Sequence, residues 1–251
     1  MLDTLRARAH DAAARSHVPY SQRPAGAAVL LADGRILQAP RLENASFPLT
    51  ITAIQGAVAL ALHSGGEPVA VALHRDLEDA DAAIVHQSFP GDWVADGSIL
   101  TRGSLPHADL ENEPDLEAPS DLEAATALAL EAADHAVVPA SGFHVGALVE
   151  DESGRCVMGA NVEVEADWTR GLCAERVALV RAAALGFGTI RRVTVACVPS
   201  PGGSPCGGCR QVLAELAPEC EVVNWRGDRA PEVTTPHALL PGVFTAEFLR
   251  G

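Results

Sequence analysis

Hydrophobic and polar residues along the chain follow helical and strand periods in an order that occurs twice. Two Ala-rich stretches, 4–17 and 122–136, have the spacing of amphipathic helices. Each is followed by two apolar runs around a Gly-marked turn, within 19–35 and 139–155, and such runs predict paired strands. Each half of the chain is therefore predicted to begin with a helix and two strands.

The same order continues beyond the paired strands. Residues 52–60 and 173–181 have helical spacing, and the apolar runs 68–73 and 192–198 predict one further strand in each half. Each half is thus predicted to be an α/β unit with the order helix, two strands, helix, strand.

Matching residues at an offset of about 120 indicate that the two halves are an internal repeat. The matched pairs include Pro19 and Pro139, Ser21 and Ser141, Gly26 and Gly146, and Gly34 and Gly154. The segment 106–121 is acidic, contains prolines and follows neither period, so it is predicted to be a linker. We expect one domain at 1–105 and a second at 122–251.

Charge and hydropathy narrow the range of partners. The 251-residue chain has a formal net charge of −15 and scattered basic residues, which argues against a nucleic-acid partner. No window is apolar enough to span a bilayer, and the N-terminal sequence "MLDTLRARAH" lacks the apolar core of a signal peptide. We expect a cytoplasmic protein without a membrane partner.

Cysteines supply the first candidate chemistry. All six lie in the second half, and Cys206 and Cys209 form a C-x-x-C pair that suits tetrahedral zinc. Cys173 is a third candidate ligand, placed where one predicted helix begins, and Cys209 is placed where another begins. Three protein ligands leave one coordination position for water, which is typical of a catalytic zinc site rather than a structural one.

Two residues beside Cys173 complete the candidate centre. Glu175 begins the same predicted helix and can reach the open position without ligating, so it is a candidate to move a proton between water and substrate. A solvated acid in a first helical turn is the plainer reading of Glu175 taken alone. Arg176 is a candidate to offset the negative charge of three thiolates.

The sequence "CAER" (173–176) followed by "PCGGCRQ" (205–211) resembles the signature of the cytidine deaminase family. The similarity covers 122–251 and, more loosely, 1–75. It implies an α/β/α sandwich around a mixed sheet in each half. It also implies zinc, and hydrolytic deamination of cytidine and deoxycytidine to their uracil counterparts in pyrimidine salvage. The nucleoside would be a small-molecule partner.

The resemblance also implies roles for individual residues. Cys173, Cys206 and Cys209 match the zinc ligands, Glu175 the proton shuttle, and Arg176 an arginine that hydrogen-bonds the thiolates. Asn161 and Glu163 match a pair that holds the ribose hydroxyls. Phe143 matches an aromatic residue near the base, and Phe244 matches one that reaches a neighbouring subunit's site; ordinary core packing is the alternative for both.

The first half has lost this chemistry. Thr52 and Ile54 stand at the ligand and base positions, and no cysteine precedes residue 156, so we expect a non-catalytic domain. It nevertheless keeps "ENASF" (43–47), which the second half has lost. In single-domain members of the family that this sequence resembles, which form tetramers, the alanine and the aromatic residue of this segment protrude into an adjacent subunit's pocket. The resemblance therefore implies that Ala45 and Phe47 complete a catalytic pocket in trans, in a homodimer.

Two other functions are compatible with the sequence. The segment 164–171 departs from the family pattern, so the substrate could be another aminated nucleoside or a nucleoside antibiotic. A zinc-stabilised binding protein without turnover is the alternative of another class, and Glu175 argues against it, because a structural zinc site needs no acid there.

Overall fold

The computed structural model describes residues 1–106, 111–112 and 114–249, and these form two compact units. The first unit comprises Met1–Glu43, Ile51–Pro114 and Val164–Gly171, and the second comprises Asn44–Thr50, Asp115–Glu163 and Leu172–Gly251. The two short segments 44–50 and 164–171 thus belong to the unit that is built mainly from the other half of the sequence. This exchange is a difference from the predicted division of the chain.

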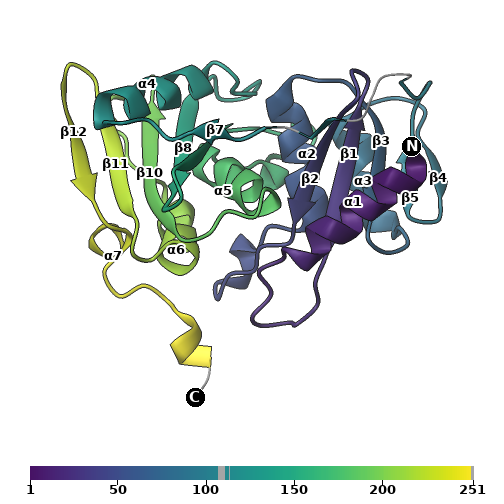
Figure 1. Ribbon diagram of the computed structural model, residues 1–251, viewed down its shortest axis with the longest axis horizontal. Helices are drawn as coiled ribbons and strands as arrows, with labels where there is room; N and C mark the ends of the chain where they lie inside the picture. The colour runs from purple at the N-terminus through teal and green to yellow at the C-terminus, as the bar shows by residue number, and fades with distance from the viewer. Residues whose placement is uncertain (107–110, 113, 250–251) are drawn as a thin grey trace. The chain divides into compact units, whose positions relative to one another are not determined.

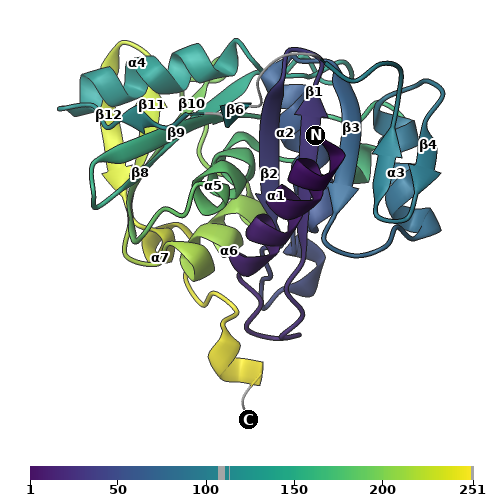
Figure 2. The same ribbon diagram turned by 45° about the vertical axis from the view of Figure 1, so that its right-hand side comes forward.

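The first unit is a mixed six-stranded sheet with the strand order β4-β5-β3-β1-β2-β6 (Figure 1). Its pairs are antiparallel except for the parallel pair β2–β6. Helix α1 lies across one face, and α2 and α3 lie on the other (Figures 1 and 2). Its elements are α1 (Leu2–Ala14), β1 (Gly26–Leu31), β2 (Arg35–Pro40), α2 (Ala53–Ser64), β3 (Pro68–Leu73), α3 (Asp79–Ser88), β4 (Val94–Asp96), β5 (Ile99–Thr101), β6 (Glu111–Asn112) and the 3₁₀ turn η2 (Trp168–Arg170).

The second unit has the strand order β12-β11-β10-β8-β9-β7, with β10 and β11 parallel and the other pairs antiparallel. Helix α4 packs on one face, and α5 and α6 pack on the other. Its elements are η1 (Phe47–Leu49), β7 (Leu116–Glu117), α4 (Leu122–Ala133), β8 (Val145–Asp151), β9 (Arg155–Ala160), α5 (Ala174–Ala184), β10 (Ile190–Cys197), α6 (Gly207–Leu216), β11 (Glu221–Arg226), β12 (Arg229–Thr234), α7 (Pro236–Leu239) and η3 (Ala246–Leu249). The predicted three-layer sandwich around a mixed sheet is confirmed.

The repeat is visible in strand register and in helix packing. Gly26 pairs with Pro40 in β1–β2, and Gly146 pairs with Ala160 in β8–β9, at the same offset of 120. A β-carbon on Gly26 would overlap the backbone of α1, and one on Gly146 would overlap the backbone of α4. The Ala-rich helices can approach the sheets this closely because a glycine lies beneath each of them.

The two units differ after their third main strand. In the second unit, β10 leads through α6 to the parallel strand β11, a crossover that needs a helix. In the first unit, α3 is followed by the hairpin β4–β5, and β5 is antiparallel to β3. The first unit therefore has no counterpart of the crossover that contains the C-x-x-C pair, within the part of the chain that the structure describes.

The predicted linker contains two short strands. Within 106–121, β6 pairs with β2 and β7 pairs with β9, each through two residues. Residues 107–110 and 113 of the predicted linker lie outside the described residues. Backbone pairing at a sheet edge does not require alternating side chains, so hydrophobic periodicity could not reveal these strands.

None of the described helices combines the length and the apolar character that crossing a membrane requires.

Candidate metal centre and active site

Three cysteine side chains from two helices meet in the second unit. The sulfur atoms of Cys173, Cys206 and Cys209 all lie within 4.8 Å of one another, and the first two are 3.6 Å apart. Zinc–thiolate bonds of about 2.3 Å at tetrahedral angles separate sulfur atoms by about 3.8 Å. The donor set therefore fits zinc.

Both helices present their N-terminal ends to these sulfurs. Cys173 is the N-cap of α5 and Cys206 is the N-cap of α6. The sequence predicts that α6 begins at Cys209, whereas it begins at Gly207, because the Cys206 sulfur accepts the Cys209 N–H and caps the helix there. The partial positive charge at both helix ends favours thiolate over thiol.

The pKa values of the three cysteines are shifted in opposite directions by the hydrogen bonds among them. Hydrogen bonds with Cys173 and Cys209 lower the pKa of Cys206 to about 2. The bond with Cys206 raises the pKa of Cys173 to about 12, and the bond with Cys173 raises the pKa of Cys209. Without a metal, the Cys206 thiolate is thus stabilised by hydrogen bonds from the thiols of Cys173 and Cys209. Binding of a dication would favour ionisation of all three cysteines, with release of protons.

Glu175 lies beside this cluster in the first turn of α5 and is only 3% exposed. Burial is the main cause that raises the pKa of its carboxyl group to about 7, and the negative charge of Cys206 acts in the same direction. A hydrogen bond with Cys209 opposes the shift. A carboxyl group that titrates near neutrality can both accept and donate a proton, as the predicted role requires.

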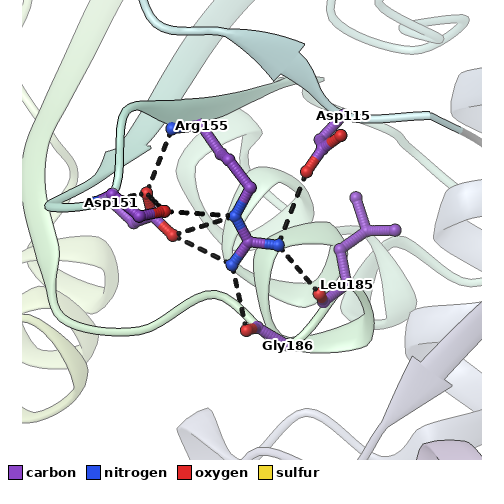
Figure 3. Close-up of polar contacts among 6 residues, drawn as sticks. Asp115, Asp151, Arg155, Leu185 and Gly186 are labelled. Carbon is purple, nitrogen blue, oxygen red and sulfur yellow. Dashed lines mark hydrogen bonds and ion pairs between the residues drawn. The ribbon is translucent and has the colours of Figure 1, made fainter.

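The C-terminal end of α5 is held by Arg155 (Figure 3). Its guanidinium donates to the carbonyls of Leu185 at 3.3 Å and Gly186 at 3.1 Å, which follow the last turn of the helix. The same group pairs with Asp151 at 3.0 Å and with Asp115 at 3.5 Å. A cation at this end complements the helix dipole, so Arg155 fixes the helix that carries Cys173 and Glu175 at its other end.

Arg176 contacts the exchanged segment 44–50. Its Nη2 donates to the Leu49 carbonyl at 3.3 Å, whereas the resemblance implies hydrogen bonds to the sulfurs. Gln55 stands at the corresponding position of the first unit, and its amide donates to the Arg170 carbonyl at 3.1 Å. The same repeat position therefore binds the exchanged segment in each unit.

The segment 44–50 also lies against α6. The Ala45 N–H donates to the Glu215 carboxylate at 2.7 Å, and Ala45 is buried. A β-carbon on Gly208, inside the C-x-x-C turn, would lie 3.2 Å from Leu49 Cδ2. The structure thus brings Ala45 into the unit that holds the cysteine cluster of the same chain.

The two predicted ribose-binding residues are held by backbone groups. The Glu163 carboxylate accepts the N–H groups of Ala140 at 2.9 Å and Ser141 at 3.1 Å, together with the Ser141 hydroxyl. Burial would raise the pKa of Glu163, but these bonds outweigh it and hold the pKa below its usual range. Asn161 accepts the Val145 N–H at 2.9 Å. Both side chains are therefore fixed in orientation.

The three predicted aromatic site residues are exposed in the single chain. Phe143 is 40% exposed, Phe244 42% and Phe47 83%. Phe244 stacks on Phe248 with ring centroids 5.5 Å apart. Contact of these rings with a ligand or with a partner chain, including the expected role of Ala45 and Phe47 in trans, stays a prediction.

The first unit has the same local backbone arrangement at this position, but Thr52 and Ile54 replace Cys173 and Glu175. Thr52 caps α2 through its hydroxyl, and Ile54 is buried where Glu175 stands in the second unit. Glu43 accepts the N–H and hydroxyl of Ser21 as Glu163 does from Ser141, and it also pairs with Arg41 at 3.0 Å.

Sequence reasoning missed two supporting contacts. Ser141 and Ser21 hold the two glutamates, and their match in the repeat, beside the match of Glu163 and Glu43, was the signal that could have revealed them. Glu215 holds Ala45 across a long sequence separation, and no local pattern marks it.

Known proteins match both halves. Two family models, each described as the cytidine and deoxycytidylate deaminase zinc-binding region, match residues 119–224 and 2–90. A cytidine deaminase of Halalkalibacterium halodurans is 41% identical over 122 residues, which are 47% of this chain and 90% of that protein. One from Sporosarcina psychrophila is 37% identical over 132 residues, 51% and 95% of the two chains. The structure of a cytidine deaminase from Burkholderia pseudomallei is 36% identical and covers 49% of this chain and 98% of its own, with a TM-score of 0.45.

Proposed function

Because the chain belongs to the cytidine deaminase family, we propose that it hydrolyses cytidine and deoxycytidine to uridine and deoxyuridine, with release of ammonia. The observation that carries this proposal is the buried Glu175 beside three converging sulfur atoms. The catalytic domain is 122–251, completed by 44–50, and the domain at 1–105 is non-catalytic. The reaction belongs to pyrimidine salvage in the cytoplasm.

Cys173, Cys206 and Cys209 would hold the zinc ion, which supplies a Lewis acid that makes water nucleophilic at neutral pH. Glu175 takes a proton from the attacking water and delivers it to the ring nitrogen beside C4. A second proton passes through Glu175 to the amino group, which leaves as ammonia. Its burial keeps these transfers away from bulk water and raises the pKa of the carboxyl group above its usual range, which favours its acting as a proton donor as well as an acceptor.

Glu163 and Asn161 orient the sugar. The lowered pKa of Glu163 keeps it an anionic acceptor for a ribose hydroxyl. Asn161 uses its carbonyl on Val145 and one N–H on the Phe143 carbonyl at 2.8 Å, so its second N–H is left for the sugar. Because Asn161 also fixes the backbone of Phe143, sugar binding and the position of that ring are coupled.

The test of the reaction is the variant Glu175→Gln in the full chain. Gln keeps the size of the side chain but cannot shuttle a proton, so we expect bound zinc to be retained while turnover of cytidine falls by about 10²-fold or more. Zinc is measured by atomic emission and turnover by the ultraviolet change from cytidine to uridine. Glu152→Gln, at an exposed turn of the same unit, serves as the matched control.

Wild-type activity of Glu175→Gln would overturn the catalytic assignment. Absence of zinc from the wild-type protein purified without chelators would overturn the metal centre itself.

A further inference from the structure

A pocket of about 520 Å³ lies in the first unit, where the repeat places the counterpart of the metal centre. Thr52, Ala53 and Ile54 at the start of α2 line it, and they match residues 173–175 of the second half. Its volume lies within the range of pockets that bind small molecules. Loss of the metal ligands has therefore left an open cavity in the non-catalytic unit.

The wall of this pocket is rich in arginine. Arg23, Arg41 and Arg75 all line it. Arg75 is neutralised by Asp81 at 2.7 Å and by Glu78 at 3.6 Å, and both acids also line the pocket. The Arg23 guanidinium has no hydrogen bond or ion pair with any residue that the structure describes. Arg23 is therefore a cation without a counter-ion at the pocket.

Arg41 changes what the pocket can recognise. It stands where the second half has Asn161, and its Nη2 pairs with the Glu43 carboxylate at 3.0 Å. Glu43 corresponds to the proposed ribose-binding Glu163. Because the Glu43 carboxylate is already paired with Arg41, it is not available to accept hydrogen bonds from the hydroxyl groups of a neutral sugar. The Arg41 Nε is buried and has no partner among the described groups, and a buried N–H without an acceptor is costly.

The remainder of the wall is apolar and unreactive. Ile54, Leu73 and Ile84 line the pocket, and Ile54 replaces the proton-transfer acid. The first N–H groups of α2 have no intrahelical partner and add a partial positive charge beside these side chains. The wall thus combines one unpaired cation, Arg23, with an apolar surface and lacks a group for catalysis.

We propose that this pocket is a non-catalytic binding site for a small organic anion, a phosphate monoester or a carboxylate with a compact apolar body. Arg23 binds the anionic group, and the apolar side chains contact the body. The neutral nucleoside site of the second unit and this anion site are then two differently specialised copies of one ancestral cavity.

The test measures binding of phenyl phosphate, benzoate and benzyl alcohol to the full chain by titration calorimetry. None of these is a nucleoside, so occupation of the deaminase site does not enter. We expect at least one of the two anions to bind at one site per chain, and the neutral benzyl alcohol not to bind. The anion that binds more tightly distinguishes a phosphate site from a carboxylate site.

Two variants locate the binding. Arg23→Gln removes the unpaired cation and should weaken anion binding by about tenfold or more. Ala80→Phe fills the pocket from the exposed side of α3 and should abolish it. Arg6→Gln, which removes an arginine on α1 of the same unit, should leave affinity unchanged. All three variants should keep wild-type deamination, because the residues changed lie outside the unit that holds the proposed active site.

The proposal is overturned if neither anion binds at millimolar concentration, or if benzyl alcohol binds as tightly as the anions. It is also overturned if binding survives both Arg23→Gln and Ala80→Phe.

Discussion

At the scale of single residues, Asp151 shows how burial and hydrogen bonding compete at one carboxylate. The residue is 1% exposed, and burial alone would raise its pKa. Ser153 donates its N–H at 2.9 Å and its hydroxyl at 2.6 Å, and Arg155 adds its backbone N–H and guanidinium (Figure 3). The effect of these hydrogen bonds exceeds that of burial and lowers the pKa of Asp151 to about 2.

The lowered pKa predicts how stability depends on pH. The stabilisation is fully present above the unfolded pKa near 4 and is lost as pH falls toward about 2, because the unfolded carboxylate binds its proton first. Asp151→Asn should therefore lower the free energy of unfolding by about 2 kcal/mol at neutral pH, and by much less near pH 2. Denaturant unfolding at several pH values measures the difference.

Asp228→Asn, at the exposed turn between β11 and β12, is the matched control and should change stability little at any pH. A difference between wild type and Asp151→Asn that stays constant from neutral pH to pH 2 would contradict the role assigned to ionised Asp151.

The convergence of the three cysteines could be predicted from the sequence, but the contacts that support them could not. Cys173, Cys206 and Cys209 were identifiable because few residue types bind zinc and their spacing fits helix N-termini. Arg176 was assigned to the sulfurs by resemblance, whereas its described hydrogen bond is to the Leu49 carbonyl. That contact depends on which unit receives the segment 44–50, and local sequence does not contain this information.

At the scale of elements, periodicity predicted the strands and helices that bury an apolar face. The strand at 68–73 agrees with β3, and the helix expected at 173–181 agrees with α5 to within a few residues. Periodicity missed β6 and β7, because pairs of two residues at a sheet edge have no period to detect. It also missed the hairpin β4–β5, whose first strand is exposed throughout.

The close approach of α4 to β8 depends on Gly146. A β-carbon there would overlap the backbone of Ala129 and Ala133, so even Gly146→Ala must displace the helix. We expect the free energy of unfolding to fall by about 1–3 kcal/mol, measured by denaturant unfolding. Gly188→Ala is the control, since a β-carbon there meets no atom within 4 Å. Equal stability of the two variants would contradict this packing.

At the scale of the whole molecule, each compact unit contains a short segment from the other half of the sequence. The repeat makes Phe47 and Trp168 corresponding residues of these segments, 83% and 63% exposed. Phe47 belongs to the second unit, which contains the cysteine cluster, and Trp168 belongs to the first unit.

This difference predicts that only one of the two aromatic residues affects catalysis. Phe47→Ala should raise KM for cytidine with zinc content unchanged, because the ring is proposed to complete a pocket without touching the metal. Trp168→Ala is the matched control and should leave KM unchanged. Steady-state kinetics with sedimentation measurements on both variants separate a pocket effect from loss of the dimer. Unchanged KM in Phe47→Ala would remove this residue from the substrate site.

The exchange of segments 44–50 and 164–171 constrains how such a gene can evolve. A deletion that removed the first copy would also remove Ala45 and Leu49, which contact the helices that bear the cysteine cluster. Selection for the function of the second copy would therefore also preserve the segment 44–50 of the first copy. If the first copy is non-catalytic as proposed, its other positions can accumulate changes such as Arg41, and the copy can acquire a role of its own.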